Sequence, residues 1–220
     1  TSKWKINSNN KIQENSNIYF KNNYYLNYGT YLTCQNIVLD NYQLEVSLQS
    51  GDNDTIGIAY HKKKKSHYLL VTDKQKKKTS LAQYLDGTLD NIIESIENTY
   101  YEQESDFRFK IITQVPRTQI YVKGNFVIGD ETRFLVDWQL LFDVEHSDYQ
   151  EGTIALYSAG QQDGGGSYFW DISLLSKPFD APYQTPKIAT FQSQNGNVGL
   201  FSMGINDPET KAIFIYTYGL

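Results

Sequence analysis

The sequence predicts an all-β protein, an antiparallel β-sandwich, from three observations. Aromatic residues are abundant, with 18 Tyr and 11 Phe among 220 residues, and they favour strands that bury one face. Turn-forming residues recur over 1–40 about every eight to twelve positions, which is the spacing of short sandwich strands. Apolar and polar residues alternate over 42–49, as in a half-buried strand. A chain of this length commonly forms one β domain of ~200–250 residues.

The first half of the chain contains the most regular alternation. Every second residue from Tyr42 to Leu48 is apolar and would lie on one face of a strand. A similar pattern covers 55–61 and again 67–73, and the residues at 51–54 tolerate tight turns. We therefore expect three consecutive antiparallel strands.

Later strands follow from the same alternation, interrupted by turn residues. Asp86-Gly87 is a hairpin signal, and Pro116 ends the strand before it because proline cannot donate to a ladder. The acidic segment 89–104 indicates a connection with a strand around 92–96. The remaining expected elements are a strand over 107–115, a strand that begins at Ile120 and is closed by 123–125, an inserted hairpin over 126–137, and strands over 138–144, 153–158 and 168–174.

Residues 1–176 form the predicted sandwich domain. Three prolines within 178–186 indicate a linker or crossover after it. The strand-like remainder of 177–220 then begins a following unit or extends a sheet of the first. Because the sequence starts at Thr1 and not at Met, we expect a mature or excised segment of a longer protein.

Composition excludes several classes of function. The net charge is −5 and the pI is about 5.2, so no overall basic charge attracts nucleic acid. No apolar run reaches the ~18 residues of a membrane-spanning segment. Cys34 is the single cysteine, which rules out an internal disulfide framework and a cysteine-rich zinc site. We expect Cys34 to be a buried residue near the end of a strand.

Three segments carry a resemblance to a known superfamily. They are the acidic turn and strand over Ser50–Tyr60, the Gly-Thr-Ile-Ala-Leu-Tyr-Ser strand over 152–158, and Phe-Trp-Asp-Ile over 169–172. Their order and spacing over 4–175 resemble the concanavalin A-like lectin and glucanase jelly-roll superfamily, most closely its thrombospondin C-terminal and laminin G-like domains. Asn53 departs from the family pattern, which tends to have an acid there.

The resemblance implies two packed antiparallel sheets in an extracellular or cell-surface protein. It also implies calcium at an acidic rim loop, and work in adhesion or glycan binding. In this sequence, Asp52, Asn53 and Asp54 offer the hard oxygen ligands that calcium prefers, and Asp73 is expected at the same end of the sheet. Two alternatives remain open, an ordinary Asx-rich turn and glycosylation of Asn53 in an Asn-Asp-Thr acceptor.

Two lysine runs indicate polyanion contact or solvated loops that protect sheet edges. They comprise Lys62, Lys63, Lys64 and Lys65, and then Lys76, Lys77 and Lys78. One strand of ~27 Å separates them, so we expect them at opposite ends of the sheet. His61 and His67 flank the first run and are expected to form a solvent-exposed pair, whereas His146 fits no metal or catalytic pattern.

Several tyrosines provide a second candidate contact surface for sugar or protein, alongside a role in packing. They are Tyr24, Tyr25, Tyr28, Tyr31, Tyr100 and Tyr101.

The sequence identifies no catalytic residues. Retaining glycosidases of the jelly-roll class hold paired carboxylates on one strand face, and this sequence lacks the Glu-x-Asp-x-Glu pattern. We therefore predict a non-catalytic extracellular binding or assembly module, with a protein partner or another copy of itself as its ligand. The alternatives are a glycan-binding lectin domain and a carbohydrate-active enzyme. An enzyme would place its carboxylates in 86–106, which includes Glu102 and Glu104, or in 126–137.

Overall fold

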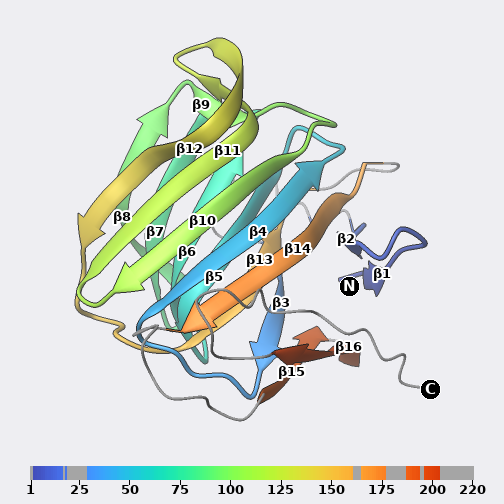
Figure 1. The fold of residues 1–220 in the computed structure, drawn as a ribbon, viewed down its shortest axis with the longest axis vertical. Helices are drawn as coiled ribbons and strands as arrows, with labels where there is room; N and C mark the ends of the chain where they lie inside the picture. Colours follow the sequence, from blue (N-terminus) through green and yellow to red (C-terminus); the bar gives the residue numbers. More distant parts are fainter. Residues whose placement is uncertain are drawn as a thin grey trace.

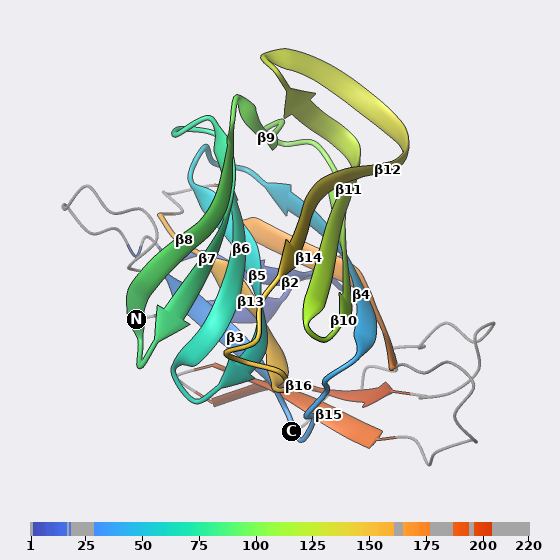
Figure 2. The same cartoon turned by 90° about the vertical axis from the view of Figure 1, so that its left-hand side faces the viewer.

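The protein is a sandwich of two eight-stranded antiparallel sheets, shown in Figures 1 and 2. The computed structural model describes residues 2–16, 18, 29–160, 165–176, 187–193 and 196–203. This described part contains strands and turns without a helix, which confirms the predicted all-β class. It accordingly offers no helix able to cross a membrane.

Each sheet mixes strands from distant parts of the chain. Sheet A contains, in spatial order, β1 (Trp4–Ile6), β2 (Ile12–Glu14), β14 (Ser167–Ser176), β4 (Tyr42–Ser50), β10 (Phe107–Gln114), β11 (Arg117–Ile128) and β12 (Glu131–Glu145), with β9 (Thr99–Tyr101) paired to β11. Sheet B contains β16 (Gly196–Met203), β15 (Lys187–Ser193), β3 (Thr30–Gln35), β13 (Thr153–Ser158), β5 (Thr55–Lys63), β6 (Ser66–Asp73), β7 (Lys78–Leu85) and β8 (Thr88–Glu97).

The core lies between the sheets and follows from the alternation in the sequence. Leu44, Val46 and Leu48 point inward from β4, and they meet Phe109 and other inward residues of β10 and β5 in one apolar cluster. Fully burying a side chain of this size contributes roughly 1.5–3 kcal/mol. Cys34 is buried in the same cluster near the end of β3, as the sequence predicts, and burial raises the pKa of its thiol to about 12.

Several predicted local elements are confirmed. Asp86 and Gly87 form the β7–β8 turn with positive φ angles of 50° and 89°, which suits a primed hairpin turn. β10 ends at Gln114, two residues before Pro116. The strands predicted over 153–158 and 168–174 are β13 and most of β14.

The expectation of three consecutive neighbouring strands is wrong. β5 and β6 pair as a hairpin, but β4 belongs to the opposite sheet, so 51–54 is an arch that crosses the sandwich rather than a hairpin turn. Alternation predicts a strand without revealing its neighbours. β5 is also buried on both faces, because a second apolar cluster lies on the outer face of sheet B.

Two further boundaries differ from the prediction. The acidic segment is mostly β-structure, β8 followed by β9, and two register shifts against β7 disturb the periodicity of its isoleucines. β11 continues past Gly124 to Ile128, and β12 returns as one 15-residue strand. The predicted inserted hairpin is therefore the outer end of the β11–β12 pair, which rises above the sandwich in Figure 2.

The end of the chain is described only in part. β15 pairs with β3 and with β16, at the edge of sheet B. The boundary at residue 176 stays a prediction, because the proposed linker and the residues after 203 lie outside the described residues. Tyr24, Tyr25 and Tyr28 lie outside them as well.

Candidate functional site

The outer face of sheet A carries aromatic and charged side chains in rows set by strand register. We call it the aromatic-polar face and define it by Glu45, Arg108, Lys110, Tyr121, Trp138 and Trp170. Across β14, β4, β10 and β11, the first row reads Trp170, Ser47, Arg108 and Lys123. The second row reads Ser173, Glu45, Lys110, Tyr121 and, on β12, Leu140.

Local sequence explains why these side chains point outward. Those on β4, β10 and β11 alternate with buried residues such as Val46 and Phe109, and neighbours on a strand point to opposite faces of a sheet. A bulge in β14 after Trp170 turns Asp171 into a left-handed conformation with φ of 47°. Bulges re-aim side chains in this way. As a result Asp171 also reaches the aromatic-polar face, where it contacts Arg108.

Lysines cover both tryptophans. The Lys11 ammonium lies 3.5 Å from the ring centroid of Trp170. The Lys110 ammonium lies 4.3 Å from the ring centroid of Trp138 and 4.9 Å from that of Tyr121. Such cation–π contacts are worth roughly 0.5–1 kcal/mol at exposed sites, so a ligand could displace them.

The centre of the face is an ionic cluster between the aromatic groups. The Arg108 guanidinium donates to Glu45 Oε2 at 3.1 Å and also to Asp171 Oδ2. Burial lowers the pKa of Lys110, an effect that the charge of Lys123 strengthens and that of Glu45 opposes. Both tryptophans and all three central charged residues are partly buried. Their rotamers are therefore restricted before any ligand binds.

This arrangement suits a flat, amphipathic ligand. Aromatic rings can stack on the apolar face of a sugar ring, while carboxylates accept from and guanidinium groups donate to its hydroxyls. β14 and β12 are four strand spacings apart, ~19 Å, which would accommodate several sugar residues between the tryptophans. Both carboxylates of the face, Glu45 and Asp171, contact the Arg108 guanidinium.

The predicted metal-loop residues do lie together. Thr55 pairs with Asp73 in register, and Gln75 donates its amide to the Asn53 carbonyl. The pKa of Asp54 is raised to about 7, first by burial and then by the charges of Asp52 and Asp73. This confirms the expected position of Asp73 at the same end as the loop.

The carboxylates of Asp52 and Asp73 accept hydrogen bonds from neighbouring protein groups. Asp52 Oδ1 accepts from the Asn53 amide at 2.7 Å. Asp73 accepts from the Lys76 amide and the Thr55 hydroxyl. Within the described ranges, no three His, Cys, Asp or Glu side chains are grouped to hold a metal ion. Calcium binding and glycosylation of Asn53 both stay predictions.

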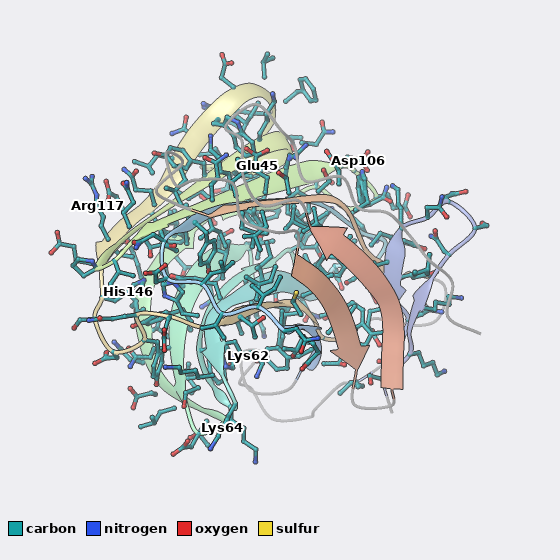
Figure 3. All side chains as sticks on the ribbon, turned by 60° about the horizontal axis from the view of Figure 1, so that its bottom comes forward. Glu45, Lys62, Lys64, Asp106, Arg117 and His146 are labelled. Atoms are coloured by element: carbon teal, nitrogen blue, oxygen red, sulfur yellow. The ribbon has the colours of Figure 1, made fainter. Side chains whose placement is uncertain are left out.

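The lysine runs lie at opposite ends of β6, as expected. The first run lines a pocket on the sheet-B side, and Figure 3 shows Lys62 and Lys64 on the side of the molecule away from Glu45. In the second run, Lys78 lies 3.8 Å from Glu97 in an ion pair, while Lys76 and Lys77 are exposed.

The predicted exposed histidine pair is wrong. His61 and His67 are both buried, and they lie on opposite faces of sheet B. His61 packs against Tyr42 and Tyr60 in the core, whereas His67 stacks on Tyr84 at 4.8 Å on the outer face. A register shift between Tyr60 and Lys63 breaks the simple alternation that the prediction assumed. His146 is half-buried beside Tyr68, and burial with the charge of His61 lowers its pKa to about 4.

Two further candidates from the sequence, Tyr101 and Glu102, are engaged with protein groups. Tyr101 is buried, and its hydroxyl donates to the main-chain oxygens of Asp52 and Asp54. Glu102 accepts from Lys74 at 2.8 Å, which lowers the pKa of its carboxyl, the opposite of what a general acid needs. Glu104 is exposed in the turn before β10.

Sequence reasoning missed the aromatic-polar face. The alternation of β4 and β10 does expose Glu45, Arg108 and Lys110, but each strand alone looks like an ordinary solvent face. Trp138 and Trp170 were visible as tryptophans in strand patterns. Only the register between strands places them around the charged cluster.

Comparison with known proteins supports the fold class. No protein-family model matches this sequence, and no curated protein matches it. The carbohydrate binding module CBM66 from Bacillus subtilis superposes with a TM-score of 0.59 and 14% identity, covering 79% of this chain and 91% of that chain. A functionally unknown protein from Saccharomyces cerevisiae gives a TM-score of 0.51 and 12% identity, covering 80% and 96%. The protein is therefore an antiparallel jelly-roll sandwich, related in fold to concanavalin A-like domains.

Proposed function

We propose that this chain is a non-catalytic carbohydrate-binding domain that holds a glycan on the aromatic-polar face of sheet A. The observation that carries the proposal is the placement of Trp138 and Trp170 on either side of the Glu45–Arg108–Lys110 cluster. Stacking surfaces with hydrogen-bonding charges between them suit a polyhydroxylated ring. The likeness in fold to a carbohydrate binding module supports the same choice.

Glycan binding is favoured over the other functions that the sequence leaves open. An enzyme would need a carboxyl held neutral near the sugar, and the carboxylates of this face contact Arg108 instead. The extracellular setting, a role in adhesion or assembly, and closeness to thrombospondin C-terminal and laminin G-like domains remain part of the proposal. Each of them is compatible with a glycan as the ligand.

A glycan array with calorimetry on its strongest ligand tests the proposal. We expect Trp138→Ala and Trp170→Ala each to weaken binding by roughly 30-fold, about 2 kcal/mol, as for other central tryptophans of interfaces. No product should form from the bound oligosaccharide over a day, as judged by chromatography.

Phe134→Ala provides the matched control. Phe134 is 69% exposed on the same strand, four residues or ~13 Å from Trp138. Its removal should leave affinity within twofold of the unchanged protein. Equal losses from Phe134→Ala and Trp138→Ala, or full affinity in both tryptophan variants, would place the glycan elsewhere. Hydrolysis of the bound glycan would overturn the proposal of a non-catalytic binding domain and show that the protein is an enzyme.

A further inference from the structure

A basic pocket lies on the opposite side of the molecule from the aromatic-polar face. We call it the lysine pocket. It occupies about 680 Å³ between the end of β3, the β5–β6 turn and the β7–β8 turn. Its lining includes the lysines of 62–65 and the aromatic residues Tyr31, His67 and Tyr84, and no Asp or Glu lines it.

Most of this positive charge is uncompensated within the described part of the chain. Lys63 pairs with Glu151 at 2.6 Å. Lys62, Lys64 and Lys65 have no carboxylate within ion-pairing distance among the described residues. Lys62 donates instead to the Lys64 carbonyl, and burial lowers the pKa of its ammonium. Three cations beside a hollow without acids make the local potential attractive to an anion.

The floor of the pocket is aromatic and neutral. His67 Nδ1 donates to the Lys65 carbonyl at 3.1 Å, so Nε2 is left to accept from the Tyr31 hydroxyl at 3.1 Å. Burial and the charge of Lys62 lower the pKa of His67 to about 3, which keeps the ring neutral. These bonds hold the lysine turn against the floor.

We propose that the lysine pocket binds an acidic sugar, one that carries a sulfate ester or a carboxylate. A volume of about 680 Å³ is much larger than a lone oxyanion and lies in the usual range for small-molecule pockets. Partly exposed Tyr31, which packs against the buried ring of His67, offers apolar area for a sugar ring, and Lys64 and Lys65 offer charge at the rim. This site is separate from the aromatic-polar face and does not depend on the function proposed there.

Calorimetry with three oligosaccharides of equal length tests the pocket. They are a heparin tetrasaccharide, which carries sulfate and carboxylate, tetragalacturonate, which carries carboxylate alone, and neutral maltotetraose. We expect the heparin fragment, tetragalacturonate or both to bind at physiological salt, which identifies the acidic group, and maltotetraose to bind at least 10-fold more weakly. Lys64→Glu should weaken the acidic ligand by about 10-fold or more, because it removes an attraction and adds a repulsion.

Lys77→Glu is a closely matched control. Lys77 is exposed in the turn at the other end of β6, with a φ of 54° against 53° for Lys64. Both variants change the net charge equally, and melting curves establish that both fold. If Lys64→Glu unfolds the protein, Lys65→Glu serves in its place. An equal effect of Lys77→Glu, equal binding of maltotetraose, or no binding of either acidic ligand would overturn the proposal.

The two sites can fail separately. Trp138→Ala and Trp170→Ala should leave acidic-sugar binding at the lysine pocket within twofold. If the tryptophan variants lose affinity for the acidic sugar and Lys64→Glu does not, the acidic sugar binds on the aromatic-polar face and the proposal of a second site is refuted.

Discussion

The stability of the folded protein is expected to depend on pH through Asp54, a residue of the 51–54 arch. Its half-buried carboxyl has a pKa of about 7, above the usual 3.8, because of burial and the charges of Asp52 and Asp73. A raised pKa in the folded state means that folded protein binds the proton more tightly than unfolded protein does. Stability is therefore lost as pH rises from about 4 to 7, and the loss is complete above that range.

Replacement of this carboxyl should stabilise the protein at alkaline pH. In metal-free buffer, Asp54→Asn should melt above the unchanged protein at pH 8, and the difference should shrink toward zero at pH 4. Asp143→Asn is the contrasting control, because Arg117 lowers the pKa of exposed Asp143 to about 2. It should not raise the melting temperature at pH 8. A melting difference for Asp54→Asn that does not change with pH would contradict the assigned pKa.

At the scale of elements, the 51–54 arch joins the two sheets and is held from several directions. The buried Tyr101 hydroxyl of β9 donates to the main-chain oxygens of Asp52 and Asp54 at 2.7 and 2.6 Å. Gly51 packs so closely on Gly165 that an added Cβ would lie 2.9 Å from its Cα. The arch therefore has a fixed backbone that holds the carboxylates of Asp52 and Asp54 near that of Asp73 in β6, so that the three repel one another at one end of the sandwich.

Bound calcium would relieve that repulsion and stabilise the folded protein. The melting temperature therefore tests the prediction that calcium binds at this arch. We expect calcium near 1 mM to raise the melting temperature by about 1–6 °C relative to chelator, as for an extracellular site of ~10⁻⁴–10⁻³ M. The rise should be larger at pH 8 than at pH 6, because protons compete for Asp54. Asp54→Asn should abolish it. The absence of a rise in the unchanged protein would remove calcium from this arch.

At the scale of the molecule, local patterns predict strands but not their neighbours. The alternation of β4 and β10, the Asp86-Gly87 turn and the burial of Cys34 follow from short stretches of sequence, and all are confirmed. The split of β4 and β5 between sheets depends on long-range packing, which alternation does not encode.

The candidate site was harder to predict than the fold for the same reason. Glu45 and Arg108 are 63 positions apart and meet through the β4–β10 register. Asp171 joins them only through a bulge in β14. The lysine runs were visible in the sequence, yet the pocket around the first run is also lined by the end of β3. β13 pairs with both β3 and β5, and this pairing brings β3 into the same sheet as the lysine run.

Indole proton signals offer the most direct test of glycan binding on sheet A. The chain has three tryptophans, and Trp4 is a built-in reference because it is buried and its Nε1 donates to Thr30 at 2.9 Å. In an NMR titration with the strongest array ligand, the indole peaks of Trp138 and Trp170 should move with one shared affinity while that of Trp4 stays. If the ligand binds and neither of those two peaks moves, the glycan does not lie on the aromatic-polar face.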